Sequence, residues 1–369
     1  MIFRRVNRVS LVLIVLLCVT FALGAQPLQE QKVPTSEHTA IDALNRRVTV
    51  NGPLERILIA GRAAVMPADA LFMFPLVADI EVILAKTDQG LGDFFPLLRQ
   101  EYATKGRLGQ QIGVEEILAY NPSLIITKRN NYDSVVKLLE PFNVPVFVMD
   151  LETSDAWKEE IVELGKLLGD EKTPQKIIKL FNQREAQVAQ KIGSLKTEER
   201  PKTLVLQTAL SDGVAAFSVA PNNWIQTFLV EKSGGNPVWL ESNVTSNTWR
   251  KVSFEQIASW DPDEIILVNY STPADEFIEA IRESPQWQQL KAAINGKIYT
   301  APADLMSYFQ ADSRWILALQ WLSAKLHPNL FSEVEIEAEI YSFYRDFYNI
   351  EDEQTLSLIV DAYRRRSNY

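Results

Sequence analysis

Residues 114–127 read VEEILAYNPSLIIT, and residues 254–268 read FEQIASWDPDEIILV. Both stretches open with an apolar residue, Glu, a second Glu or Gln, and Ile, and both then reach an aromatic residue, Asn or Asp, Pro and an apolar run. Early glutamates favour a helix N-terminus, and proline ends a helix because it cannot donate a backbone hydrogen bond. The apolar run that follows is typical of a buried strand. The chain is therefore predicted to form the same helix–turn–strand unit twice, with the two prolines 140 residues apart.

The regions around the two copies alternate short apolar runs with helical patterns, which is typical of parallel β/α units. Residues 41–153 are predicted to form an N-terminal lobe and residues 197–330 a C-terminal lobe. Residues 154–196 show helical periodicity and hardly any strand pattern, and they include one long amphipathic helix. Residues 331–369 are predicted to be helices that pack on the C-terminal lobe. We expect an α/β fold of two β/α lobes with short, mainly parallel sheets, joined by a long backbone helix.

The N-terminus has the layout of a secretory signal peptide: an arginine-rich start, an apolar run over 9–23 and small residues near position 25. We expect cleavage after a signal peptide of residues 1–25, and an uncleaved membrane anchor is the alternative. Residues 26–40 are polar and are expected to form a flexible tether. The single cysteine, Cys18, lies inside the apolar run, so the exported chain is expected to have no disulfide and no thiolate metal site.

Composition argues against several classes of protein. The formal net charge of the 369-residue chain is −10, which disfavours a general nucleic-acid binder because such proteins need a basic surface. The sequence contains no G-x-S-x-G, H-E-x-x-H or P-loop motif. The two histidines, His38 and His327, are far apart, so a direct zinc or manganese site is disfavoured. Direct binding of ferric iron by tyrosines and carboxylates stays open, although no cluster marks such a site.

Several stretches in the same order resemble the periplasmic binding proteins of ABC importers for ferric siderophores, haem and cobalamin, the class with a rigid helical backbone. The resemblance runs from about residue 41 to residue 348. It rests on the repeat and on four stretches: VTVNGPLERILIAG (48–61), WRKVSFEQIASWDPDEIILV (249–268), SPQWQQLKAAINGKIY (284–299) and SRWILALQWLSAKLHPNLF (313–331) followed by FYRDFY (343–348).

The resemblance implies a ligand cleft between the two lobes and no catalysis. A protein of this family captures a metal chelate, here expected to be a ferric siderophore, and delivers it to an ABC permease with its ATPase. Haem or a corrinoid is the alternative ligand. We expect a periplasmic monomer with no cofactor of its own and no nucleic-acid partner. Two other interpretations stay open, namely an exported α/β hydrolase and a ligand sensor that does not transport.

Candidate site residues follow from the rule that ligands bind beyond the carboxyl ends of parallel strands. The residues that come after predicted strands and carry planar donors or aromatic rings are Arg62, Arg129, Tyr132, Tyr270 and Tyr308. The resemblance adds the loops before the two repeated helices, with Arg107, Trp249 and Arg250. It also implies that an exposed acid on each lobe docks the permease, for which Asp133, Asp275 and Glu276 are the candidates by position. All these residue types also occur as ordinary surface or core side chains.

Overall fold

The computed structural model describes residues 37–84, 89, 92–99, 108–109, 112–211, 214–240, 248–270 and 275–367. The predicted signal peptide lies outside the described residues. The predicted tether was expected to extend to residue 40, but Glu37–Ile41 forms strand β1, which pairs antiparallel with β2 (Arg47–Asn51). The backbone N–H of Ile41 also donates to Glu163 Oε2 at 2.7 Å. Residues 37–40 therefore belong to a sheet and not to a tether.

The N-terminal lobe is built on a parallel sheet with the strand order β4-β3-β5-β6 in the described part of the chain. Its strands are β3 (Arg56–Ala60), β4 (Glu81–Leu84), β5 (Leu124–Lys128) and β6 (Val146–Met149). The strands are short and almost wholly apolar because both faces of the sheet are covered. The helical segments of this lobe are α2 (Val65–Phe72), η1 (Pro75–Asp79), α3 (Phe95–Leu98), α5 (Val114–Ala119), η2 (Arg129–Asn131), η3 (Tyr132–Val136), α6 (Lys137–Leu139) and η4 (Glu140–Phe142).

The C-terminal lobe contains a six-stranded sheet in the order β10-β8-β7-β11-β12, with β9 pairing β7. Its strands are β7 (Lys202–Ser211), β8 (Val214–Val219), β9 (Asn236–Pro237), β10 (Arg250–Val252), β11 (Glu264–Val268) and β12 (Ile298–Thr300). The β7–β11 and β11–β12 pairs are parallel, whereas β7–β8 and β8–β10 are antiparallel. The sheet is thus mixed, because a hairpin adds an antiparallel edge to a parallel centre. The remaining segments are η5 (Thr197–Glu199), α9 (Ile225–Lys232), α10 (Phe254–Trp260), α11 (Asp275–Glu283), η7 (Trp287–Gln289) and α12 (Lys291–Ile294).

The repeated stretches form the predicted unit, once in each lobe. In the first copy α5 leads into β5, and in the second copy α10 leads into β11. Each turn contains a non-glycine residue with positive φ directly before the proline: Asn121 at 47° and Asp261 at 46°. Asn and Asp tolerate this conformation better than other residues because their short polar side chains can hydrogen-bond locally. The isoleucines of the two copies, Ile117 and Ile257, are both buried.

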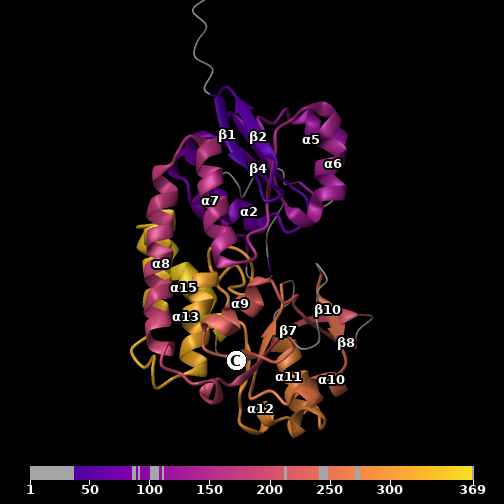
Figure 1. Cartoon of the computed structure of the whole chain (residues 1–369), viewed down its shortest axis with the longest axis vertical. Coiled ribbons are helices and arrows are strands. Elements are labelled where there is room, and N and C mark those ends of the chain that lie inside the picture. Colours follow the sequence, from indigo (N-terminus) through magenta and orange to yellow (C-terminus); the bar gives the residue numbers. More distant parts are fainter. Residues whose placement is uncertain are drawn as a thin grey trace, which may run out of the picture. The chain divides into compact units, whose positions relative to one another are not determined.

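The lobes are joined by helices that run along one side of the molecule (Figure 1). These are α7 (Ser154–Leu168), α8 (Lys172–Ile192), α13 (Trp315–Leu326), α14 (Ile336–Tyr348) and α15 (Glu353–Ser367). One aromatic cluster holds four of them together, because Phe181 of α8 lies 4.3 Å from Trp157, 5.0 Å from Trp315 and 4.9 Å from Phe347 between ring centroids. The predicted α/β fold with a long backbone helix is confirmed.

The C-terminal helices differ from the expectation in one respect. They were expected to pack on the C-terminal lobe, but α14 also contacts the N-terminal lobe and α8. The hydroxyl of Tyr348 donates to Asp69 in α2, and Arg184 of α8 donates to Asp346 Oδ2 at 3.1 Å. The helix therefore ties both lobes and the backbone helix together.

Candidate ligand-binding site

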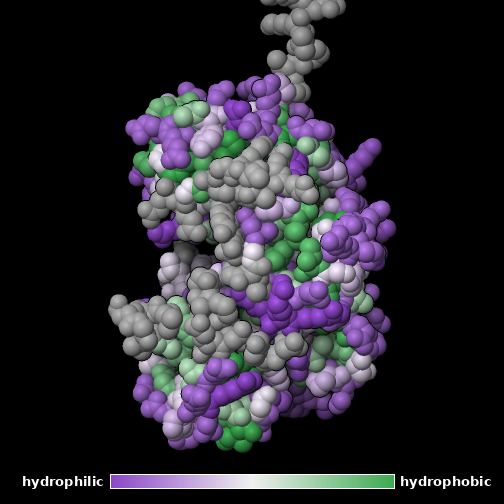
Figure 2. All heavy atoms as spheres, turned by 180° about the vertical axis from the view of Figure 1, so that it is seen from behind, coloured by the Kyte–Doolittle hydropathy of each residue, from purple (hydrophilic) through white to green (hydrophobic). Residues whose placement is uncertain are grey.

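A cavity of about 610 Å³ lies between residues of the two lobes, and we call it the central cavity. The space-filling view shows that the outline of the molecule is indented between its two halves (Figure 2). Most of the lining residues of the N-terminal lobe come from the loops after β3, β5 and β6. Those of the C-terminal lobe come from the start of α9, the segment before β10 and the loops after β11 and β12. This position agrees with the rule that ligands bind beyond the carboxyl ends of parallel strands.

A buried asparagine holds the N-terminal wall of the central cavity in shape. Asn131 accepts a hydrogen bond from the backbone N–H of Arg62 at 3.0 Å and donates to the carbonyl oxygen of Arg62 at 2.9 Å. The loop after β3 is thereby fixed to the loop after β5. Gly61 makes this possible, since its φ is +88° and a Cβ there would lie 2.6 Å from Cγ of Asn131.

The two cations among the described lining residues are each paired with a carboxylate. Lys128 Nζ lies 2.7 Å from Glu152 Oε1, and both side chains are largely buried. Arg129 Nη1 lies 3.3 Å from Asp150 Oδ2 in a more exposed position. Burial raises the pKa of Glu152, while the charge of Lys128 acts in the opposite direction. The N-terminal wall is consequently polar but close to neutral.

The C-terminal wall of the central cavity is aromatic. Trp224, Trp249 and Tyr270 form a chain of rings, with centroid distances of 5.8 Å and 6.2 Å between successive members. The hydroxyl of Tyr270 donates to the carbonyl oxygen of Phe309 at 2.7 Å. Burial raises the pKa of Tyr270 well above its usual range, so the phenol stays protonated. Such a wall offers flat apolar area and π-faces to a ligand.

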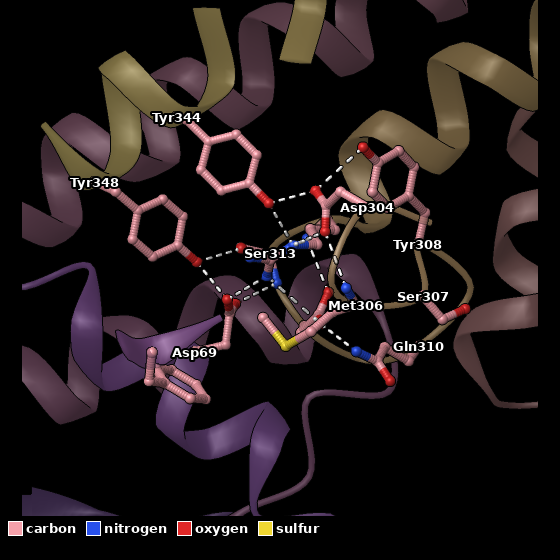
Figure 3. Close-up of polar contacts among 12 residues, drawn as sticks. Asp69, Asp304, Met306, Ser307, Tyr308, Gln310, Ser313, Tyr344 and Tyr348 are labelled. Atoms are coloured by element: carbon pink, nitrogen blue, oxygen red, sulfur yellow. Dashed lines mark hydrogen bonds and ion pairs between the residues drawn. The ribbon is translucent and has the colours of Figure 1, made fainter. Parts of the chain in front are cut away.

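The floor of the central cavity rests on a buried group of charges that we call the acid–arginine cluster: Asp69, Asp304, Asp312 and Arg314. Gln310 lines the cavity and donates to Asp312 Oδ2 at 2.5 Å. Arg314 Nη1 lies 2.6 Å from Asp69 Oδ1 and Nε lies 3.4 Å from Asp304 Oδ1, all with fully buried side chains. Figure 3 shows Tyr344 and Tyr348 of α14 pointing at Asp304 and Asp69, respectively.

Four of the predicted ligand-binding residues line the central cavity, namely Arg129, Tyr132, Trp249 and Tyr270. Arg62 is exposed in the adjoining loop and is not among the lining residues, and Arg250 lies in β10, also outside the lining. Arg107 falls outside the described residues.

The prediction for Tyr308 needs correction, because its side chain is fully buried and donates to Asp304 Oδ2 at 3.2 Å. Its ring stacks on Tyr363 of α15, at 6.2 Å between centroids. Tyr308 is therefore a core residue that supports the acid–arginine cluster rather than a wall of the central cavity.

The candidate docking acids lie at matching places in the two lobes. Asp133 is in η3, after β5, with an 88% exposed side chain that is 4.0 Å from Lys137 Nζ. Asp275 and Glu276 begin α11, after β11, and their side chains fall outside the described part of the chain.

Sequence reasoning missed Trp224 and Gln226, which both line the central cavity. They lie at the start of α9, which follows the antiparallel strand β8, so the rule for parallel strands does not reach them. The stretch NNWIQTF is typical of a helix, and a Trp in a helix is usually a core residue. The only sequence signal was the pair of asparagines before Trp224, because Asn favours a helix start and so places this tryptophan at the end of the helix rather than in its interior.

Metal-binding groups are also informative. Within the described residues, no group of three or more His, Cys, Asp or Glu side chains is arranged to hold a metal ion. His327 is buried, with Nε2 3.1 Å from the carbonyl oxygen of Gly234, and burial lowers its pKa. The aromatic wall itself consists of Trp224, Trp249 and Tyr270, which offer ring faces and no His, Cys or carboxylate ligand.

Comparison with known proteins identifies the family of this chain. Residues 75–305 match the model of the family described as periplasmic binding protein. The chain belongs to the periplasmic binding protein family. It is similar to the molybdate-binding protein MolA of Haemophilus influenzae, with 19% identity over 83% of this chain and 90% of that protein. It is also similar to a cobalamin-binding protein of Halobacterium salinarum, with 25% identity over 70% of this chain and 69% of that protein.

Solved structures have the same fold. The structure of Helicobacter pylori CeuE with Ni(II) bound superposes with a TM-score of 0.68 at 17% identity, over 87% of this chain and 99% of that chain. As a member of this family, the protein is a solute-binding protein and not an enzyme. An extracytoplasmic location follows from the family. Within the described residues, none of the helices combines the length and the apolar character needed to span a bilayer.

Proposed function

We propose that this protein captures a metal chelate in the central cavity, in the first place a ferric siderophore, and presents it to an ABC permease. The observation that carries the proposal is the aromatic chain Trp224–Trp249–Tyr270, which faces polar residues of the other lobe across about 610 Å³. A cavity of this volume suits an organic ligand of drug-like size. A bare ion would leave most of that volume and the aromatic wall unused.

A chelate fits because its organic shell satisfies the metal. The protein then needs only aromatic area, a few hydrogen bonds and charged groups, which the lining residues supply. The cobalamin-binding relative supports a corrinoid as the alternative ligand in the same role. Haem is the other alternative of comparable size.

Permease contact is the second half of the proposal. Asp133 in the N-terminal lobe and Asp275 or Glu276 in the C-terminal lobe would each enter a basic pocket of the permease. Their equivalent positions after β5 and β11 support this choice. We also propose that residues 1–25 are removed on export.

The test is titration followed by tryptophan fluorescence and by thermal unfolding, with ferrioxamine E, cyanocobalamin, haem, molybdate and Ni²⁺ as separate probes. Ferric and corrinoid chelates absorb where tryptophan emits, so binding beside Trp224 and Trp249 quenches their emission. A ligand at a hundredfold excess over Kd stabilises the folded state by about 2.7 kcal/mol. We expect at least one chelate to do both. A response to molybdate or Ni²⁺ alone would overturn the chelate proposal.

Matched variants locate the site. Trp249→Ala and Trp224→Ala should each weaken binding by about tenfold or more, because each removes a large aromatic contact. Trp260→Phe is the control, since Trp260 ends α10 away from the central cavity. Equal affinity of all three variants for the chelate would remove the aromatic wall from the site.

A further inference from the structure

The aromatic wall of the central cavity is suited to a positively charged group. The ring planes of Trp224 and Trp249 are 84° apart and those of Trp249 and Tyr270 are 56° apart, so the three rings form a bent surface and not a flat stack. All three line the cavity and are half-buried. Within the described residues, no lysine or arginine lies over these rings, in contrast to Lys325, whose Nζ is 5.6 Å from the ring centroid of Trp321. The face of a tryptophan or tyrosine ring attracts a cation within about 6 Å of its centroid.

The described basic side chains of the N-terminal wall are already held by carboxylates. The side chain of Lys128 is only 5% exposed, and its Nζ lies 2.7 Å from Glu152 Oε1 and also donates to the backbone carbonyl oxygen of Asp150. Arg129 is more exposed, but its Nη1 lies 3.3 Å from Asp150 Oδ2. A negatively charged ligand that takes either cation leaves a partly buried carboxylate without its partner, which is costly. A neutral or positively charged ligand leaves both pairs intact.

The floor of the central cavity adds an excess of negative charge. The acid–arginine cluster contains three carboxyl groups and one guanidinium, all fully buried, so its formal charge is −2. Burial raises the pKa of Asp312, and protonation of this one carboxyl still leaves the cluster with a net negative charge. Gln310 lines the cavity and donates directly to Asp312, so the cluster lies just behind the lining. Buried charges are screened less than surface charges, and this excess therefore acts on a ligand in the cavity.

We infer that the central cavity selects chelates by charge, binding a chelate with a positive group more tightly than a neutral one, and a neutral one more tightly than an anionic one. The positive group packs against the rings of Trp224 and Trp249. The inference rests on the proposed function, since it concerns the same cavity. It adds the charge class of the chelate, which favours a hydroxamate complex with a free ammonium group over catecholate and citrate complexes.

Three ferric complexes with the same iron centre form a charge series that tests it. Ferrioxamine B carries a protonated amine, N-acetylferrioxamine B is neutral, and N-succinylferrioxamine B carries a carboxylate. The pendant chain is flexible, so its end group can reach the aromatic wall. In fluorescence titrations of the wild-type protein near neutral pH, we expect Kd to rise in this order, by at least about tenfold from the first to the last. For a corrinoid, the corresponding series is the (2-aminoethyl)amide of cyanocobalamin monocarboxylic acid, cyanocobalamin, and the monocarboxylic acid itself.

Matched variants locate the source of the preference. Trp249→Leu removes a ring face and keeps an apolar side chain, so it should reduce the preference to about threefold or less. Trp249→Phe is the control, because it keeps a ring face and should retain most of the preference. Arg129→Ala tests the opposite route, in which an anionic group takes Arg129 from Asp150. We expect this variant to keep or increase the preference for the cationic member, because it leaves Asp150 without its cation.

The possible results separate the two proposals. If no member of either series and no haem binds the wild-type protein, the chelate proposal fails and this inference fails with it. If the anionic member binds as tightly as the cationic member, or if haem with its two carboxylates is the chelate that binds, the chelate proposal stands and the inference is wrong. The inference is equally wrong if Trp249→Leu keeps the full preference. Should that variant fail to fold, the order of affinities in the wild-type protein and in Arg129→Ala decides.

Discussion

Replacing Arg314 by methionine is expected to be among the most damaging single substitutions in this protein. Arg314 is fully buried and is the cation of the acid–arginine cluster. Its loss removes a charge-assisted contact to Asp69 at 2.6 Å, a hydrogen bond to Tyr344 at 2.8 Å and a cation–π contact to Phe94 at 4.4 Å. Contacts of these kinds contribute about 1.5–3, about 1 and about 1 kcal/mol, respectively. The total agrees with the about 3–5 kcal/mol found when one partner of a buried pair is removed.

The pH dependence of this loss has a definite sign. Burial and the neighbouring charge of Asp69 raise the pKa of Asp312, while Arg314 acts in the opposite direction. A carboxyl whose pKa is raised in the folded state contributes stability at low pH that is lost as the pH rises through the folded pKa. Without Arg314 the opposing effect on Asp312 is lost, so the pKa of Asp312 is raised further. The deficit of Arg314→Met should therefore be largest near pH 8 and should shrink as the pH falls towards about 4.

Urea unfolding followed by far-ultraviolet circular dichroism, at several pH values, measures the deficit in the free energy of unfolding. Asp69→Asn is the matched control. It removes one carboxylate and leaves Arg314 with Asp304 and Asp312, so we expect a loss of only about 1–2 kcal/mol. The reasoning would be refuted by an Arg314→Met protein within about 1 kcal/mol of wild type at pH 8, or by an Asp69→Asn protein that is the less stable of the two.

Three further predictions concern single side chains. Burial raises the pKa of Glu160 to about 7. Between about pH 5 and pH 7, the free energy of unfolding of the wild-type protein should therefore fall with rising pH, relative to Glu160→Gln, by up to about 1.4 kcal/mol per pH unit. Urea unfolding at several pH values measures this, and parallel curves of stability against pH for the two proteins would contradict it. Gly61→Ala should lower the melting temperature and weaken chelate binding, because the new Cβ would clash with Asn131. Gly52→Ala is the control, since Gly52 has the same φ but no neighbouring atom within 4 Å of a Cβ; it should cost only the backbone strain of a positive φ, about 1–2 kcal/mol. Tyr308→Phe should lower the free energy of unfolding by about 1 kcal/mol in thermal unfolding, because it removes the buried hydrogen bond to Asp304. Its chelate affinity in fluorescence titration should equal that of the wild-type protein, and weaker binding would indicate that Tyr308 contacts the ligand after all.

The repeat shows which features could be predicted from the sequence. Helix periodicity, the proline stop and the buried apolar run are all local, and each acts within a few residues. The units α5–β5 and α10–β11 therefore appear where the sequence places them, whereas the positive φ values at Asn121 and Asp261 were seen only in the structure. The lobes, the long helix α8 and the positions directly after the parallel strands follow from the same kind of pattern.

The residues of the candidate site also divide into those that a local sequence pattern predicts and those that it does not. Arg129 and Tyr270 directly follow parallel strands, so a rule about strand ends places them at the central cavity. Trp224 and Gln226 lie at the start of a helix that follows an antiparallel hairpin, and no local sequence pattern predicts that this helix lines the cavity. Sequence reasoning correctly pointed to the loops and missed the element that completes the aromatic wall.

Tyr308 marks the limit most clearly. It follows a strand and carries an aromatic ring, which were the grounds for predicting it as a ligand residue. In the folded chain Asp304, held by Arg314 and by Tyr344 of α14, draws its hydroxyl into the core. The amino-acid sequence by itself determined the lobes, the repeat and the loops that face the cavity, because those depend on contacts between near neighbours. Only the tertiary structure decided which side chains of these loops are buried and which line the cavity, because that depends on charges and rings brought together from distant parts of the chain.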